Sequence, residues 1–105
     1  IYNVAEEDGL TETEWIQAIA DVVGWKGEIV PVDPDKLPGS FSIHGQDLVM
    51  DTRRIRAELD YKETLSRAEG IRRTIEWDRA NPPEELPPNA FDYEAEDTVL
   101  AELGK

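Results

Sequence analysis

Residues 1–32, "IYNVAEEDGLTETEWIQAIADVVGWKGEIVPV", contain the pattern that decides the predicted fold. Residues 1–4 form a strand-like run at the very first position, and residues 28–32 form a second one. A segment with helical spacing lies between them. A strand, a helix and a second strand in this order predict a βαβ unit with two parallel strands and a right-handed crossover. Pro31 lacks a backbone N–H and therefore favours an edge position or the end of the second strand.

The predicted helix of this unit has recognisable ends. Thr11 and Glu14 have the spacing of a capping box, and Gly24 is placed to end the helix. Five apolar residues between these ends recur at helical spacing and predict one apolar face: Trp15, Ile16, Ile19, Val22 and Val23.

Further helices are predicted downstream of the two strands. Residues 33–46, "DPDKLPGSFSIHGQ", are rich in Pro, Gly, Ser and Asp and are expected to form a loop. A helix is expected from Asp51 or Thr52 to about Leu59, and a longer one over residues 63–80. The fold class is therefore predicted as α/β, a small βαβ unit with a parallel strand pair followed by two or three helices.

The longer helix supplies the expected cover of the βαβ unit. Asn81-Pro82-Pro83 is expected to stop it, because neither Pro can continue the hydrogen-bond ladder. Ile71 and Ile75 lie on its apolar side, and we expect them to share one core with Trp15 and Ile19.

The end of the chain differs in composition from the rest. Residues 84–105 carry seven acidic residues and one Lys, and residues 91–103 form a short acidic amphipathic segment. We therefore predict two parts, a domain over residues 1–83 and an acidic linker with a short helix over residues 84–105. The tail is interpreted as a solvated segment, with a partner-docking arm as the alternative.

The overall charge limits the classes of partner. The 105 residues include 24 acidic and 11 basic ones, for a net charge of −13. This balance disfavours nucleic acids and anionic membrane surfaces, because phosphates require a concentrated positive field. The chain contains no cysteine, which excludes a disulfide framework and a thiol nucleophile and mildly favours the cytoplasm.

The sequence contains no group of residues that forms an active site by itself. The turn after the first predicted strand, "AEEDG", has three acidic residues and would repel a phosphate, so a dinucleotide site is not expected here. His44 is the single histidine and cannot build a multi-histidine metal site, although a loop position suits a ligand contact. The acidic residues around the loop do not match a calcium-binding loop. We expect no cofactor and no metal bound by this chain.

Three motifs in order carry a resemblance to a known family. They are Tyr2-Asn3-Val4-Ala5, the stretch from Asp51 to Tyr61 ("DTRRIRAELDY"), and the stretch from Gly70 to Trp77 ("GIRRTIEW"). Their order and spacing resemble the C-terminal, substrate-binding part of NAD-dependent epimerase/dehydratases, the extended short-chain dehydrogenase/reductases. The resemblance covers residues 1–83 and implies a C-terminal subdomain of a Rossmann-type enzyme.

Two departures from the family pattern bear on the substrate. The family usually carries Gly before the aromatic residue of the second motif, whereas this chain has Asp60. Many nucleotide-sugar enzymes carry an Arg in the preceding loop, but no Arg lies between residues 27 and 52. The resemblance places substrate contacts at His44 and Gln46.

The resemblance also implies what lies outside these residues. The family's glycine-rich NAD fingerprint and its Tyr-x-x-x-Lys pair belong to a dinucleotide-binding domain, so the chain is expected to be a fragment that is inactive alone. NAD or NADP is implied for the parent enzyme, with a sugar, nucleotide-sugar or related polyol as the small-molecule substrate. Apolar strands without their partner domain predict self-association. The alternative hypothesis is a stand-alone acidic protein-interaction module.

Overall fold

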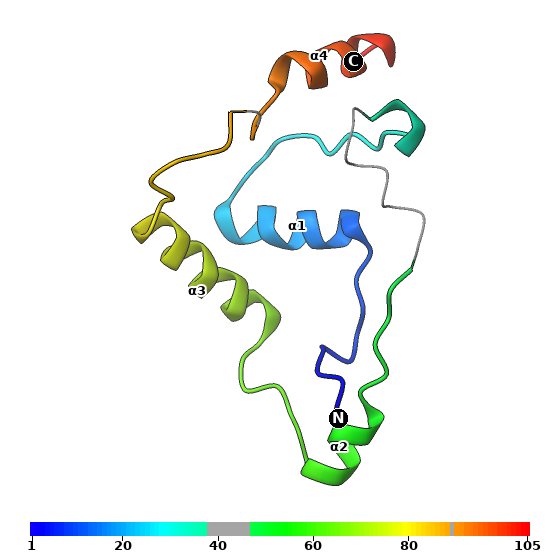
Figure 1. Ribbon diagram of the computed structural model, residues 1–105, viewed down its shortest axis with the longest axis vertical. Helices are drawn as coiled ribbons and strands as arrows, with labels where there is room; N and C mark the ends of the chain where they lie inside the picture. Colours follow the sequence, from blue (N-terminus) through cyan, green and yellow to red (C-terminus); the bar gives the residue numbers. More distant parts are fainter. Residues whose placement is uncertain (38–46, 89) are drawn as a thin grey trace. The chain divides into compact units, whose positions relative to one another are not determined.

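The computed structural model describes residues 1–37, 47–88 and 90–105 (Figure 1). Its elements are α1 (Glu12–Val23), the short 3-10 helix η1 (Pro34–Lys36), α2 (Arg53–Leu59), α3 (Arg67–Ala80) and α4 (Tyr93–Glu102). The chain divides into two compact units. Unit 1 comprises Ile1–Ile29 with Leu48–Asn81, and unit 2 comprises Val30–Asp47 with Pro82–Lys105.

The predicted βαβ unit is wrong. Helices account for 48% of the described residues, and no strand or sheet occurs among them. The two runs predicted to pair do not fall within one compact unit, because residues 1–4 belong to unit 1 and residues 30–32 belong to unit 2. Side chains also take backbone groups that a ladder would use, since Arg54 and Arg56 donate to the carbonyls of the N-terminal segment. The parallel strand pair is therefore replaced by an extended segment held through side chains.

The N-terminal segment lies against α2, as the ribbon shows (Figure 1). The Tyr2 hydroxyl donates to Glu58 Oε2 at 2.7 Å, and the Asn3 amide donates to the Asp51 carbonyl at 3.3 Å. Ile55 and Thr52 of this region are 7% and 6% exposed, which makes them two of the three buried residues in the described chain. The first motif, residues 2–5, and the second motif, residues 51–61, therefore contact each other directly.

Helix α1 confirms the predicted caps. Thr11 Oγ1 accepts from the Glu14 N–H at 3.2 Å, and Glu14 Oε2 accepts from the Thr11 N–H at 2.8 Å. Gly24 ends the helix with φ of 73°, a left-handed conformation that glycine adopts without a Cβ clash. Both ends follow from contacts between near neighbours, which explains why the sequence alone predicts them.

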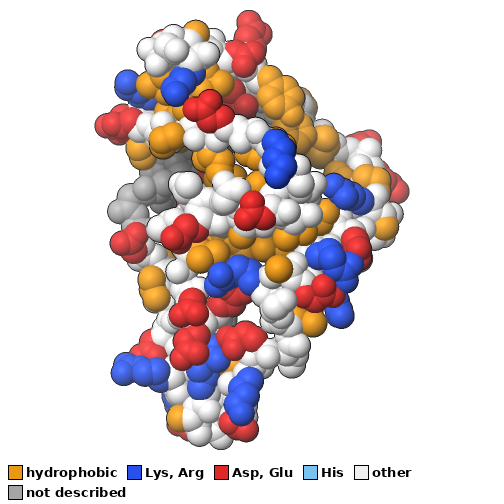
Figure 2. Space-filling model, turned by 180° about the vertical axis from the view of Figure 1, so that it is seen from behind, with side chains coloured by type: hydrophobic (Ala, Val, Ile, Leu, Met, Phe, Trp, Pro, Cys, Tyr) orange, Lys and Arg blue, Asp and Glu red, His pale blue; other side chains and the backbone are white. Residues whose placement is uncertain are grey.

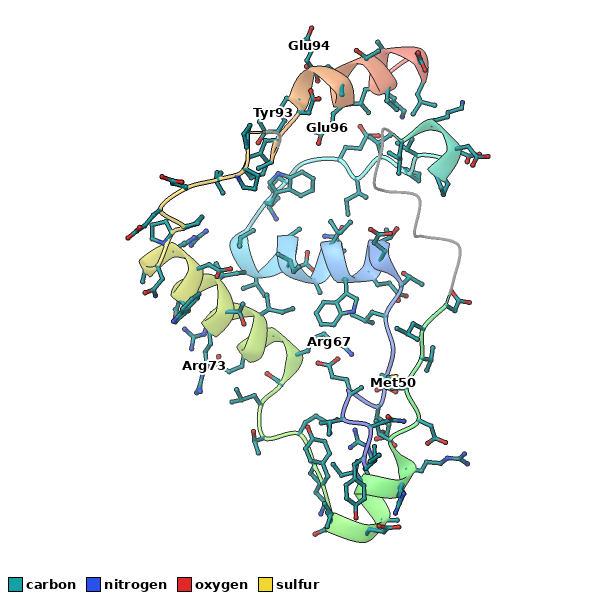
Figure 3. The ribbon with its side chains drawn as sticks, in the orientation of Figure 1. Met50, Arg67, Arg73, Tyr93, Glu94 and Glu96 are labelled. Carbon is teal, nitrogen blue, oxygen red and sulfur yellow. The ribbon has the colours of Figure 1, made fainter. Side chains whose placement is uncertain are left out.

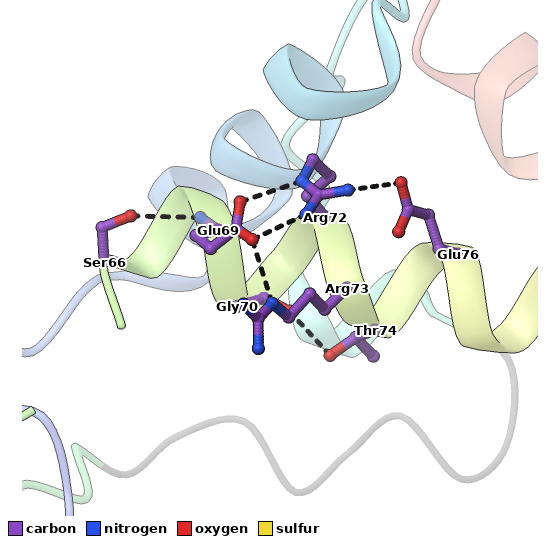
Figure 4. A network of polar contacts seen from close by, with 7 residues as sticks. All are labelled: Ser66, Glu69, Gly70, Arg72, Arg73, Thr74 and Glu76. Carbon is purple, nitrogen blue, oxygen red and sulfur yellow. Dashed lines mark hydrogen bonds and ion pairs between the residues drawn. The ribbon is translucent and has the colours of Figure 1, made fainter. Parts of the chain in front are cut away.

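Helix α3 begins at Arg67, later than predicted. The Ser66 side chain accepts from the Glu69 N–H at 3.2 Å and caps the helix there. The helix ends at Ala80, before Asn81 as expected. An ion-pair network along its exposed side joins Glu69 to Arg72 and Arg73, and Arg72 to Glu76 (Figure 4).

The predicted core is open to solvent. Trp15 and Ile19 are 39% and 43% exposed, although α1 packs against α3. Ile71 and Ile75 of α3 are half-buried and line the same space as Trp15 and Ile19. Figure 2 shows hydrophobic side chains reaching the surface among charged ones. The structure thus brings the four predicted residues together in one cleft, but it leaves them partly exposed and does not bury them in a core.

Unit 2 contains η1 and α4. The Asp33 side chain accepts from the Asp35 N–H at 3.1 Å at the start of η1, and the Asp92 side chain accepts from the Ala95 N–H at 3.0 Å at the start of α4. Tyr93 stacks on Phe91 with ring centroids 5.8 Å apart, and both rings are more than half exposed.

Candidate functional site

The substrate contacts predicted from the resemblance were His44 and Gln46. Both lie outside the residues that the structure describes. The site developed below comes from unit 1 alone and does not include them.

A cleft of about 600 Å³ lies in unit 1 between α1 and α3. This volume falls in the range of roughly 300–1,000 Å³ that small-molecule sites occupy. Its apolar lining consists of Trp15, Ile19, Leu65, Ile71 and Ile75, with Gly70 beside them. Its polar lining consists of Glu6, Tyr61, Glu63, Thr64, Ser66, Arg67, Thr74 and Asp78.

One face of α3 forms a wall of the cleft. Residues three and four apart on a helix share a face, and Gly70, Thr74 and Asp78 follow this spacing, as do Ile71 and Ile75. Apart from its chain neighbours and the backbone of its own helix, no atom of the described residues lies within 4 Å of the place where a Cβ on Gly70 would stand. Gly70 therefore leaves room in the wall that a larger residue would fill.

Arg67 joins α3, α1 and the N-terminal segment. Its Nε donates to Glu6 Oε2 at 2.7 Å and its Nη2 donates to the Asp8 carbonyl at 2.9 Å. Its guanidinium also lies over the Trp15 ring, 5.7 Å from the centroid. Figure 3 shows Arg67 between the beginning of α3 and the N-terminal segment, whereas Arg73 points away from α1. Arg67 thus fixes Trp15 and Glu6 as neighbours in the cleft.

Arg56 fixes the loop between α2 and α3 in a similar way. It donates from Nη1 to Glu63 Oε2 at 3.0 Å, and its guanidinium lies 5.4 Å from the centroid of the Tyr61 ring. The hydrogen bonds from Arg56 lower the pKa of Glu63 to about 2, so Glu63 is ionised at neutral pH. A second aromatic ring and a second carboxylate are therefore held at the cleft.

The cleft lining contains more anionic than cationic side chains. Its lining contains three carboxylates, on Glu6, Glu63 and Asp78, and a single cationic side chain, that of Arg67. Glu6 and Glu63 have arginine partners. No hydrogen bond or ion pair reaches the Asp78 carboxylate within the described ranges. An incoming ligand therefore meets acceptors with spare lone pairs and a negative local field.

The start of α1 is an unfavourable place for the pyrophosphate of a dinucleotide. The capping box uses the N–H groups of Thr11 and Glu14, and the acidic residues Glu6, Glu7 and Asp8 precede the helix, so a pyrophosphate there would meet repulsion. The part of the chain that the structure describes contains no cluster of three potential metal ligands. No helix in that part has the length and apolar character needed to cross a membrane.

The sequence analysis did not predict the cleft, although the residue pattern of α3 contains an indication of it. Gly70 interrupts the apolar face of α3, and the polar residues Thr74 and Asp78 continue that face. A glycine and polar groups on a helix face that also carries Ile71 and Ile75 indicate a partly open surface. Nothing in the sequence indicates that Glu6 and Tyr61 join them, because those contacts depend on tertiary structure.

Comparisons with known proteins leave the family open, since no family model, curated protein or solved structure matches the chain.

Proposed function

We propose that this chain is the substrate-binding C-terminal part of an NAD(P)-dependent epimerase/dehydratase-like oxidoreductase. Its substrate is a sugar, nucleotide-sugar or related polyol. In this proposal the catalytic Tyr/Lys pair and the NAD fingerprint lie in a dinucleotide-binding partner domain. The enzyme works in the cytoplasm, which the absence of cysteine favours.

The backbone at Asp60 is the observation that carries the proposal. Asp60 ends α2 with φ of 51° and ψ of 36°, in the left-handed region, and it is the one described non-glycine residue with positive φ. This conformation favours glycine, because other side chains bring a Cβ clash. The family that the sequence resembles carries glycine at this point of the motif. The local geometry therefore supports the alignment despite the different residue.

The first two motifs of the resemblance also contact each other. Tyr2 and Asn3 bond to Glu58 and Asp51, and Arg56 donates to the Ala5 carbonyl at 3.1 Å. The third motif, residues 70–77, lies within α3 and lines the cleft through Gly70, Ile71 and Ile75. Segments far apart in sequence thus form one unit, which supports their interpretation as parts of a single family pattern.

The surface of unit 1 supports a partner domain. Leu48 and Val49 are 80% and 77% exposed in an extended segment, and Val4 is 58% exposed. Large exposed apolar side chains of this kind are expected where a partner covers them. We expect the isolated chain to self-associate through them, and more so at high salt, which screens its net charge of −13. A sedimentation profile of a strict monomer at low and high salt contradicts this part of the proposal.

The coding sequence around this chain is the most direct test. A G-x-x-G-x-x-G motif after a strand and a Y-x-x-x-K motif, both encoded upstream in the same frame, are the expected result. The product that contains both should interconvert or oxidise sugars with bound NAD or NADP, measured by chromatography of the sugars and absorbance of reduced nicotinamide. A frame that begins close to Ile1 and encodes neither motif overturns the proposal.

The isolated chain provides the matched control. We expect it to have no dehydrogenase, epimerase or dehydratase activity and no affinity for NAD⁺ or NADH, because its sequence contains neither the glycine-rich NAD fingerprint nor a Tyr-x-x-x-Lys pair. Titration calorimetry with both nucleotides checks this. Micromolar binding contradicts the assignment of the cofactor to a separate domain.

The second candidate is a stand-alone acidic protein-interaction module. The stacked, exposed rings of Phe91 and Tyr93 beside the acidic helix α4 favour it. Figure 3 shows Glu94 and Glu96 on this helix next to Tyr93. An upstream frame without the two enzyme motifs would make this the better interpretation.

A further inference from the structure

The cleft of unit 1 has the lining of a site for a ligand that donates hydrogen bonds. The carboxylates of Glu6, Glu63 and Asp78 accept hydrogen bonds only, and Arg67 donates only. Two donors of Arg67 are already used, by Glu6 and by the Asp8 carbonyl. The hydroxyl groups of Tyr61, Thr64 and Ser66 can donate or accept, and the Thr74 hydroxyl already donates to the Gly70 carbonyl. The three carboxylates add acceptors only, and the Asp78 carboxylate has no hydrogen-bond partner among the described residues.

The two aromatic side chains of the lining, Trp15 and Tyr61, favour a ligand with an apolar face. Trp15 and Tyr61 are held by guanidinium groups 5.7 and 5.4 Å from their ring centroids, so their orientation is set before a ligand arrives. Trp15 keeps 39% of its surface exposed. An aromatic ring packs against the C–H face of a sugar ring while its hydroxyls reach polar groups at the edge.

The negative charge of the lining disfavours ligands that carry phosphate groups. A diphosphate brings negative charge to a cleft with three carboxylates and one arginine, which is itself paired. Repulsion between like charges disfavours such a ligand. Hydroxyl groups that donate to carboxylates form charge-assisted hydrogen bonds, which are roughly twice as strong as neutral ones.

We propose that the cleft between α1 and α3 binds an uncharged, polyhydroxylated ligand, a free sugar or sugar alcohol, in preference to a nucleotide-sugar. This deepens the proposed function, on which it rests for the link to catalysis, by naming the substrate class. Trp15 and Tyr61 contact the ring or carbon chain, and Glu6, Glu63 and Asp78 accept from its hydroxyls. Gly70 leaves the space that the ligand fills.

The test is an NMR titration of the isotope-labelled, purified chain. The probes are glucose, galactose, mannose and sorbitol as neutral ligands, and UDP-glucose as the charged one. The indole N–H signal of Trp15 is assigned with Trp15→Phe, because Trp25 and Trp77 give similar signals. At least one neutral probe should shift the Trp15 signal, and UDP-glucose should bind no more tightly than glucose. A chain that no neutral probe shifts, or that binds UDP-glucose tenfold more tightly than every neutral probe, overturns the inference.

Paired substitutions on α3 test the position of the site. Gly70→Leu places a side chain in the cleft and should weaken binding by about tenfold or more, the loss expected when ~1.4 kcal/mol of contact is removed. Ala80→Leu adds the same side chain to an exposed position outside the lining and should leave binding unchanged. Equal binding by the two variants contradicts the location.

A charge reversal tests the selectivity. Asp78→Lys should weaken binding of the neutral probe and strengthen binding of UDP-glucose. Glu76→Lys makes the same change in charge on α3 outside the cleft lining and should change neither affinity. Because both positions are exposed, circular dichroism should report a folded protein in each case. Unchanged selectivity in Asp78→Lys overturns the electrostatic argument.

The outcomes separate this inference from the proposed function. A chain whose frame encodes the NAD motifs but whose cleft binds no neutral probe retains the function and loses the inference. A chain that binds sugars in the cleft but lacks those motifs retains the inference and loses the enzyme assignment.

Discussion

The two ends of unit 1 differ in how far their side chains are buried. At the α2 end, Ile55 and Thr52 are buried and Arg56 donates to the Ala5 carbonyl and to Thr52 Oγ1, so polar bonds close the surface. At the α1–α3 end, Trp15 and Ile19 remain open to solvent. The difference teaches that side-chain hydrogen bonds close the surface at α2, whereas apolar surface stays open to solvent between α1 and α3.

Two isoleucine truncations should separate these ends by the largest margin. Ile55→Ala removes a buried side chain and should lower the free energy of unfolding by about 2–5 kcal/mol. Ile19→Ala should cost clearly less, about 1 kcal/mol, because 43% of the Ile19 surface stays in water in the folded chain. Urea unfolding measures both. Similar losses would show that the cleft is closed in solution.

Removing Arg56 should release the N-terminal segment. Arg56→Met keeps a long side chain but loses the bonds to the Ala5 carbonyl, to Thr52 and to Glu63. We expect faster backbone motion of residues 1–5, measured by NMR relaxation, and a lower midpoint of thermal unfolding. Arg53→Met is the control, because among the described residues the Arg53 guanidinium bonds only to Asp51 and its side chain is 91% exposed. Equal effects of the two substitutions contradict the clamp at α2.

Acid should weaken the α2 end through Glu63. Its pKa falls from an ordinary 4.5 to about 2 because of Arg56, so the unfolded chain binds more protons than the folded one in this interval. Stability is therefore present above about pH 4.5 and lost as the pH falls toward 2. Arginines lower the pKa of Glu69 from 4.5 to about 2 and that of Asp51 from 3.8 to about 2, so both residues contribute with the same sign. Glu63→Gln should reduce the slope of stability against pH, and an unchanged slope would exclude Glu63 as a contributor.

Substitutions of Asp60, the left-handed residue that follows α2, should change the stability by a smaller amount. Asp60→Gly relieves a conformation that is unfavourable for a side chain and should raise stability by up to about 1 kcal/mol. Asp60→Ala is the counterpart and should lower stability, because alanine has a Cβ and no side-chain polar group to offset the strain. Thermal unfolding of the pair checks the sign. A loss of stability in Asp60→Gly contradicts the motif alignment at this position.

A substitution of Gly70, in the α3 wall of the cleft, should change the stability by the smallest amount. Gly70→Ala should raise the free energy of unfolding by about 0.5–1 kcal/mol, because glycine inside a helix loses more backbone entropy than alanine. No atom stands within 4 Å of the added Cβ, so no clash opposes the gain. Urea unfolding measures it. A destabilised variant would show that the cleft wall is packed more closely in solution.

The site was less predictable than the helices around it. The face of α3 that includes Gly70 and Asp78 can be found from helical spacing, but its partners Glu6 and Tyr61 come from segments distant in sequence. The predicted contacts His44 and Gln46 stay predictions, since they lie outside the described residues. A cleft depends on which helices meet, and no local pattern contains that information.

The sequence by itself determined both ends of α1 and the end of α3, whereas the start of α3 at Ser66 was missed although its cap is also local. The caps at Thr11, Gly24 and Ser66 depend on hydrogen bonds between residues a few positions apart, which any surrounding fold allows. Only the tertiary structure decided that residues 1–4 lie extended against α2 instead of pairing with residues 28–32. The backbone groups of an extended segment find partners far along the chain, and here guanidinium and amide side chains from the α2 region provide them.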